Sequence, residues 1–231
     1  YQELVIPQSE PWDNLGKLKK EREVVGIYIS GHPLDDFKKE MRWFTNAKLS
    51  QLKDLNSLVN KNLNVGGIVN EIQHSESRNG KGWGRFTLED FSDQFEFRIF
   101  GEEYLKFKHF ISVNQFVRIK INIKEGWRNQ ETGRLGDPRI QFISFEMLHD
   151  ALSKNSKKLT LQLDISQVKS ESIRQLKKEL NGFKGDKLLF FDVIDSEKQL
   201  KLTLASRKQK VAISNELLSL LEEKPWHYKL N

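Results

Sequence analysis

Residues 116–124 alternate strictly between apolar and polar side chains, and this pattern constrains the fold more than any other feature of the sequence. One face of the expected strand would carry Val117, Ile119, Ile121 and Ile123, and the other Arg118, Lys120, Asn122 and Lys124. Successive side chains of a strand point to opposite faces of a sheet, so one face of this strand is expected to be buried. The chain therefore needs a sheet that covers an apolar core.

The segments around this strand predict the order β-β-β-α-β-β between residues 61 and 150. Strands are expected near 65–72, 84–90 and 95–100, a helix at 102–111, and a last strand at 139–147 after a Gly-rich loop. Gly66 and Gly67 lie inside the first strand, where a barrel strand must bend. Strand number alone leaves an antiparallel sandwich open, but the helix between the third and fourth strands favours a five-stranded OB-type β-barrel.

The flanking regions predict two further units, which makes the fold class α+β and multidomain. In residues 1–60, helices are expected over 15–29, ended by Ser30 and Gly31, and from Pro33 to Phe44, forming a helical hairpin. In residues 151–231, a linker at 153–158 should precede a small split β-α-β-β-α-β-like domain. Its strands are expected at 159–165, 187–194, 199–205, 211–213 and 226–228, with helices at 171–180 and from Ser214 or Asn215.

The residues that usually carry chemistry are absent or scattered. The chain has no cysteine, and its histidines do not share ligand spacing: His32, His74, His109, His149 and His227. Asp35 with Asp36, and Asp90 with Asp93, are typical of helix starts and turns. We expect no catalytic residue, metal site or cofactor in this segment. No apolar run is long enough to span a bilayer, so we expect a cytoplasmic protein without membrane contact.

Charge supports nucleic-acid binding only locally. The formal net charge is +6, but basic and acidic residues balance in 1–60 and in 61–150, and the whole excess lies in 151–231. Any binding site on the barrel must therefore depend on the arrangement of its side chains.

The loop between the first two barrel strands has such an arrangement. Arg78 and Lys81 could neutralise phosphates, and Trp83 could stack on a base. Arg85 and Arg98 alternate with core residues and could share the binding face with this loop. The structural alternative is an ordinary hairpin turn, with Trp83 covering the barrel edge and the arginines paired with Glu89 and Glu96.

A second candidate group lies at the fourth strand and the loop after it. It contains Lys120, Lys124, Trp127 and Arg128, which again combine basic and aromatic side chains. The alternative here is that exposed lysines protect a strand from edge pairing.

The stretch from Glu21 to Asp35, which contains Ser30-Gly31-His32-Pro33-Leu34, resembles a segment of bacterial replicative DNA polymerase III alpha subunits. The similarity continues through the glycine-containing strand at 65–69, Thr87 to Asp90, and Phe97 to Phe100. It is clear over about residues 10–150 and positional over the rest.

This resemblance implies the C-terminal part of an alpha subunit: a helical leader, an OB domain that contacts single-stranded template DNA, and a C-terminal domain that binds the tau subunit of the clamp loader. Other subunits of the polymerase III holoenzyme are implied partners. The full-length protein of this family is a DNA-directed DNA polymerase, a nucleotidyltransferase, but its catalytic aspartates lie upstream, so the segment by itself should be non-catalytic. Two alternatives stay open: another OB-fold single-strand binder, such as a tRNA-anticodon-binding domain, and a hydrolase.

Overall fold

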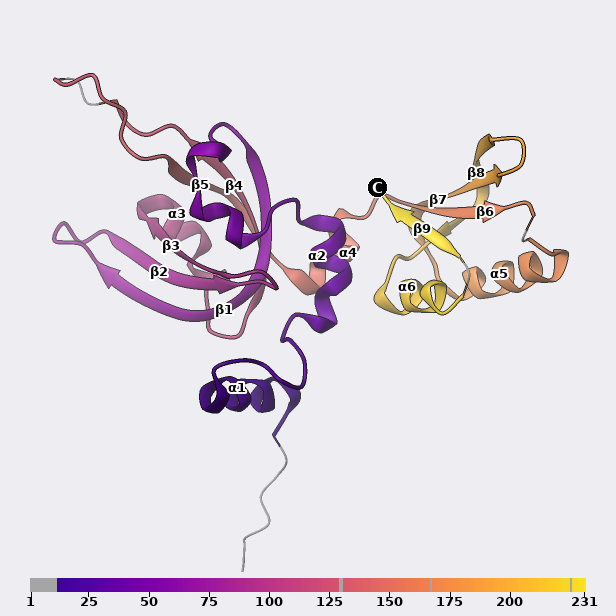
Figure 1. Cartoon of the computed structure of the whole chain (residues 1–231), viewed down its shortest axis with the longest axis horizontal. Helices are drawn as coiled ribbons and strands as arrows, with labels where there is room; N and C mark the ends of the chain where they lie inside the picture. Colours follow the sequence, from indigo (N-terminus) through magenta and orange to yellow (C-terminus); the bar gives the residue numbers. More distant parts are fainter. Residues whose placement is uncertain (1–11, 129–130, 167, 225) are drawn as a thin grey trace, which may run out of the picture.

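The computed structural model describes residues 12–128, 131–166, 168–224 and 226–231, and contains two sheets joined by helices (Figure 1). The first sheet is formed by β1 (Asn62–Glu76), β2 (Gly82–Glu89), β3 (Gln94–Phe100), β4 (Phe116–Lys124) and β5 (Arg139–Met147), with α3 (Gly101–Phe107) between β3 and β4. The predicted element order of the barrel is therefore confirmed.

The five strands form one antiparallel sheet in the order β3-β2-β1-β4-β5, curved around a single core. Gly67 lies where β1 passes so close to β2 that a Cβ atom would come within 2.3 Å of the Glu89 carbonyl oxygen. A register shift between Val69 and Glu71 follows at once. The glycine and the bulge together allow the strand to bend. β3 and β5 are the two edge strands, and the seam between them is the open side of the barrel.

The core contains the apolar face predicted for β4, because Val117, Ile119, Ile121 and Ile123 are fully buried. Phe86 of β2 and Phe97 of β3 stack inside the barrel with ring centroids 5.2 Å apart. Tyr104 and Phe107 bury the inner face of α3 against the same core. The helix thus closes one end of the barrel, as its place in the sequence indicates.

The predicted helical hairpin of the leader is not formed. Helix α1 (Asn14–Val25) ends at Gly26, earlier than expected, because Gly26 takes the left-handed conformation (φ 86°) and its N–H donates to the Arg22 carbonyl. Leu18 is the one buried residue of α1. After a short 3-10 turn (Asp35–Phe37), α2 (Lys38–Phe44) packs against a later helix instead of α1 (Figure 1).

The partner of α2 is α4 (Leu148–Asn155), which overlaps the segment expected to be a linker. Leu148 packs with Leu34 and Met41, while Ala151 and Leu152 belong to the core of the C-terminal unit. The expected boundary at 150/151 therefore falls inside a helix. The barrel and the C-terminal unit are joined by packed helices because the apolar residues of α4 face both.

The C-terminal unit has the predicted order of elements: β6 (Lys158–Asp164), α5 (Ser170–Gly182), β7 (Lys184–Asp195), β8 (Leu200–Val211), α6 (Asn215–Glu222) and β9 (His227–Leu230). Its sheet has the order β8-β7-β6-β9, with β6 and β7 parallel. The short strand expected at 211–213 is not separate, because β8 continues through Val211 after a register shift. Both helices lie on the same side of the sheet (Figure 1).

Candidate nucleic-acid interface

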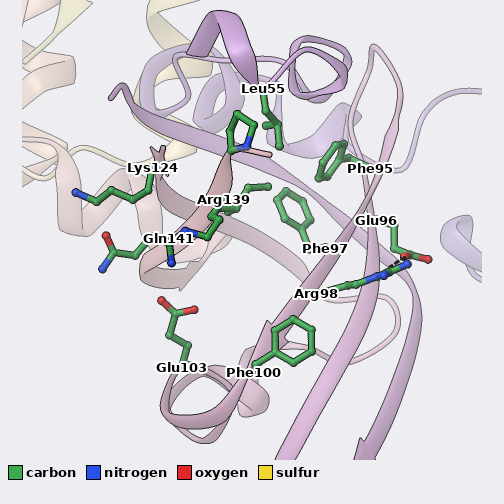
Figure 2. Close-up of a pocket in the computed structure, with 12 residues that line it drawn as sticks. Leu55, Phe95, Glu96, Phe97, Arg98, Phe100, Glu103, Lys124, Arg139 and Gln141 are labelled. Carbon is green, nitrogen blue, oxygen red and sulfur yellow. Dashed lines mark hydrogen bonds and ion pairs between the residues drawn. The ribbon is translucent and has the colours of Figure 1, made fainter. Parts of the chain in front are cut away.

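A cleft of about 710 Å³ lies along the open seam of the barrel, between β3 and β5 (Figure 2). It is lined by side chains from β3, β5, α3, the end of β4, and the segments just before β1 and β5: Leu55, Phe95, Glu96, Phe97, Arg98, Phe100, Glu103, Lys124, Pro138, Arg139, Ile140 and Gln141. Three of these are cationic at neutral pH and two are carboxylates. The cleft is therefore weakly basic and partly aromatic, although the barrel as a whole carries no excess of charge.

The outer side of the cleft is built by alternation along β3. Phe97 and Ile99 point into the core, so Arg98 and Phe100 point outward. Phe100 is 57% exposed and stacks on Trp83 of β2, with ring centroids 5.7 Å apart and an angle of 22° between the rings. The two rings form a continuous aromatic surface beside the cleft.

Arg85 and Arg98 share one face, as predicted, because they are directly opposite each other in the pairing of β2 with β3. Both pair with the same carboxylate: Glu96 is 3.4 Å from Arg85 and 3.0 Å from Arg98. Glu71 of β1 is exposed on the same face, opposite Thr87, so the two arginines share this face with two carboxylates. Glu89, the other acid considered as a partner, pairs instead with Arg22 of α1.

The loop between β1 and β2 is a tight turn that presents its basic side chains to solvent. Gly80 has a φ of 68°, and its N–H and that of Lys81 both donate to Ser77. Arg78 and Lys81 are exposed, and Trp83 is half-buried at the base of the loop. The turn predicted from the sequence is present, and its geometry is compatible with binding as well as with a purely structural role.

The β4–β5 loop brings only part of the second predicted group to the cleft. Lys124 lines the cleft directly. Trp127 is 74% exposed and lies under the guanidinium of Arg139, and Arg128 is bridged to Leu135 farther along the loop. Lys120 lies elsewhere, on the outer face of β4 beside Asn64 of β1 and Ser144 of β5. Both loops project from the same end of the barrel (Figure 1).

Arg139, Phe100 and Glu103 belong to the cleft but are not among the residues singled out from the sequence. Phe100 could have been found from the alternation of β3, because it lies two residues after Arg98 and therefore points to the same outer face. Arg139 is the first residue of β5 and pairs across with Lys124. Glu103 comes from α3, and no local pattern indicates that this helix side chain reaches the seam.

Glu103 is the titratable group in the cleft with a perturbed pKa. Partial burial raises the pKa of its carboxyl, although a hydrogen bond from the Phe142 N–H (3.2 Å) acts in the opposite direction. Figure 2 shows the carboxylate pointing toward Arg139 and Gln141. A phosphate entering the cleft would meet this negative charge, so protonation of Glu103 favours anion binding.

The acidic residues expected at turns have such roles. Asp90 accepts hydrogen bonds from the N–H groups of Ser92 and Asp93 through one oxygen and from Leu49 through the other. The Asp35 carboxylate accepts from the His32 N–H at 2.8 Å. In the described ranges, no group of three or more His, Asp or Glu side chains is placed to hold a metal ion. None of the helices described is long and apolar enough to cross a membrane.

The fold and the cleft define an OB-fold module with a basic and aromatic groove. Residues 63–153 match the sequence model of a family described as an OB-fold nucleic acid binding domain. Residues 159–231 match the model described as DNA polymerase III alpha subunit, C-terminal domain. The chain thus resembles the C-terminal segment of bacterial DNA polymerase III alpha subunits, and the resemblance expected from its motifs is confirmed.

Individual proteins similar to this chain are also DNA polymerase III alpha subunits. The DNA polymerase III subunit alpha of Mycobacterium tuberculosis is 25% identical over 222 residues, which is 95% of this chain and 18% of the relative. That of Pseudomonas aeruginosa is 24% identical over 169 residues, 73% of this chain and 14% of the relative. The chain therefore spans less than a fifth of these relatives. Among solved structures, an aspartyl-tRNA synthetase from Leishmania major has a TM-score of 0.30 and 13% identity over 44% of this chain and 20% of that chain.

Proposed function

We propose that the barrel binds single-stranded DNA in the cleft between β3 and β5. The observation that carries this proposal is the meeting of Arg98, Lys124 and Arg139 with exposed aromatic rings at the open seam. Cations placed along a groove neutralise successive phosphates, and aromatic side chains beside them stack on bases without regard to sequence. A single strand has the free base faces that this arrangement needs.

The two loops would extend this surface. Arg78, Lys81 and Trp83 lie on the β1–β2 side, where Trp83 stacks on Phe100, while Trp127 and Arg128 lie on the β4–β5 side. OB folds bind oligonucleotides on the surface of their second and third strands and between these loops. Arg85 and Arg98 lie on that surface and would exchange their shared partner Glu96 for phosphate oxygens.

In the larger protein, we propose that this segment serves binding and tethering in the cytoplasm, while it contributes no catalytic group. Its C-terminal unit would contact the tau subunit of the clamp loader and, through it, the other subunits of the polymerase III holoenzyme. The match of residues 159–231 to an alpha-subunit domain supports this role. The net positive charge of that unit is the sequence feature that most favours an acidic partner.

Titration of fluorescently labelled oligonucleotides tests the DNA-binding role. The wild type is compared with the triple variant Arg78→Ala, Lys81→Ala, Trp83→Ala at low and moderate salt. We expect the triple variant to bind at least tenfold more weakly, because two phosphate contacts and one stacking contact are removed. A triple variant of exposed residues elsewhere (Trp12→Ala, Arg174→Ala, Lys178→Ala) is the matched control. Equal binding by all three proteins contradicts the loop assignment, and no binding at low salt contradicts the DNA-binding role itself.

RNA is the competing ligand, since another OB-fold single-strand binder would recognise an anticodon loop. The same titration with RNA of identical sequence distinguishes the two, because a site built for RNA contacts the 2′-hydroxyl. Preference for DNA, or equal affinity, supports the polymerase role. A pull-down of the purified tau subunit with the full chain tests the role proposed for the C-terminal unit.

A further inference from the structure

The sheet of the C-terminal unit is covered by helices over only part of its width. Leu159 and Leu161 of β6 and Leu189 of β7 are buried under α5 and α6. Leu200, Leu202 and Leu204 of the edge strand β8 point to the same side of the sheet, because they pair with Asp195, Val193 and Phe191 of β7. These three leucines are 62%, 59% and 45% exposed. An apolar strip of β8 thus continues the core face without a helix over it.

A groove of about 320 Å³ runs between this strip and α5. Its walls are almost entirely apolar: Leu163, Ile173, Leu176, Leu180, Phe191, Val193 and Leu204, with Lys177 and Gln209 as the polar residues. Ile173 of α5 is 49% exposed and faces the groove from the helix side. Exposed leucines in register along a strand, next to an apolar groove, are typical of a surface that another protein covers.

The polar residues around the groove indicate the charge of the molecule that covers it. From Lys198 to Ala212 the chain has basic side chains and no acidic ones. Lys177 lines the groove, and Arg207 and Lys208 immediately precede the groove residue Gln209 in the sequence. None of these three cations forms an ion pair with a described residue, whereas Lys198 and Lys201 of the same segment pair with Asp195 and Asp192. The Gln209 Nε2 group is buried and has no hydrogen-bond acceptor within the described part of the chain. A carboxylate or carbonyl oxygen would satisfy it.

We propose that the groove between α5 and β8 binds an amphipathic helix with an acidic polar face, supplied by a partner protein. Such a helix would lie beside α5 and complete the helical layer over the sheet. Its apolar residues, spaced at three and four positions, would cover Leu200, Leu202 and Leu204, while its acidic residues would meet Lys177 and Arg207. The inference rests on the protein-contacting role proposed for the C-terminal unit, and it names the site and the chemistry of the partner.

A helix fits better than an added strand because the exposed apolar side chains lie on the face of β8, and not only along its edge. A strand pairing with β8 would satisfy backbone groups along the edge but would leave the leucine side chains in water. A helix of about four turns spans roughly 20 Å, similar to the length of the leucine strip and its basic end.

The test uses the full chain and a labelled 16-residue amphipathic peptide with leucines on one face and glutamates on the other. We expect binding of this peptide and none of a scrambled peptide of the same composition. Leu202→Asp and, separately, Lys177→Glu should each weaken binding about tenfold or more. Leu105→Asp, at an exposed leucine of α3 (62% exposed), is the control for a new surface charge and should bind like the wild type.

The inference is overturned if the acidic peptide does not bind, if Leu202→Asp and the wild type bind it equally, or if sedimentation shows that a second copy of the chain covers the face. Protection of the β8 edge amides from hydrogen exchange by the peptide would also overturn it, because that pattern indicates an added strand. Tau pull-downs with the wild type and Leu202→Asp separate this inference from the proposed function. Equal capture of tau by both proteins refutes the groove alone, and peptide binding without tau capture refutes the tau contact alone.

Discussion

The guanidinium of Arg139 lies over the ring of Trp127, with its central carbon 3.9 Å from the ring centroid. Arg139 is the first residue of β5, and its Nε donates to the Glu125 carbonyl at 3.3 Å, which holds the side chain across the base of the β4–β5 loop. Cation–π stacking therefore orients an exposed tryptophan before any ligand arrives. The opposite face of this ring is available for a base.

Replacing Trp127 by alanine should weaken binding of single-stranded DNA about tenfold, because stacking on one aromatic side chain contributes roughly 1–3 kcal/mol per base. Fluorescence anisotropy with a labelled oligonucleotide measures the change. Trp12→Ala is the matched control, since Trp12 is also largely exposed but lies in the leader. Equal effects of the two substitutions would show that Trp127 does not contact DNA.

Arg139→Ala should change how strongly binding depends on salt. If Arg139 contacts one phosphate, the slope of log K against log salt concentration should become less steep by about 0.7. Lys120→Ala should leave the slope unchanged, because Lys120 lies outside the cleft between Asn64 and Ser144. Binding isotherms at several salt concentrations give both slopes, and a larger effect of Lys120 would move the site to the other side of the barrel.

DNA binding should strengthen as the pH falls toward the raised pKa of Glu103. Burial favours the neutral carboxyl, and a nearby phosphate favours it further, so binding takes up a proton. Glu103→Gln should bind more tightly at pH 7 and flatten the pH profile between pH 7 and 5. Titrations of labelled single-stranded DNA across that pH range provide the measurement.

The Glu103 carboxyl has a higher pKa in the folded chain than in the unfolded chain, which also affects stability. Because the pKa of Glu103 is higher in the folded state, folding is favoured by acid: the stability is greatest below the ordinary pKa of a glutamate and falls as the pH rises through the folded value. Glu103→Gln should therefore raise the melting temperature at pH 7 and have little effect near pH 4. A melting temperature that drops at pH 7 would show that the carboxylate is stabilising.

Glu89 should be the residue that holds the leader to the barrel. It is 6% exposed and accepts hydrogen bonds from Arg22 of α1, from Asn70 and from Gln94. Glu89→Ala should lower the free energy of unfolding by about 2–3 kcal/mol, because it leaves the partly buried Arg22 without its anion. Urea denaturation measures the change. Glu23→Ala removes an exposed pair with Lys20 and should change stability by less than about 1 kcal/mol.

The alternation of apolar and polar residues in strands, and their spacing at three and four positions in helices, predicted most of the strands and helices correctly. The strand at 116–124, the bend at Gly67 and the order of elements in the C-terminal unit are local properties, set by alternation and by backbone freedom. The end of α1 was predicted wrongly because Gly26 and Gly31 are both able to end a helix. Gly26 ends it, and the chain then turns back so that the Ile29 and Ser30 N–H groups donate to the Glu21 carboxylate. The helix α4 was missed because its polar residues look like a linker until Leu148, Ala151 and Leu152 find apolar partners.

Some residues of the candidate site could likewise be predicted from local sequence patterns, and others could not. The sequence by itself determined that Arg85 and Arg98 share a face and that a turn presents Arg78 and Lys81, because strand phase and turn chemistry are local. Only the tertiary structure decided that Lys124, Arg139 and Glu103 meet Arg98 across an open seam, and that Lys120 does not. These residues are brought together by the curvature of one sheet and the placement of one helix, which depend on packing over the whole barrel.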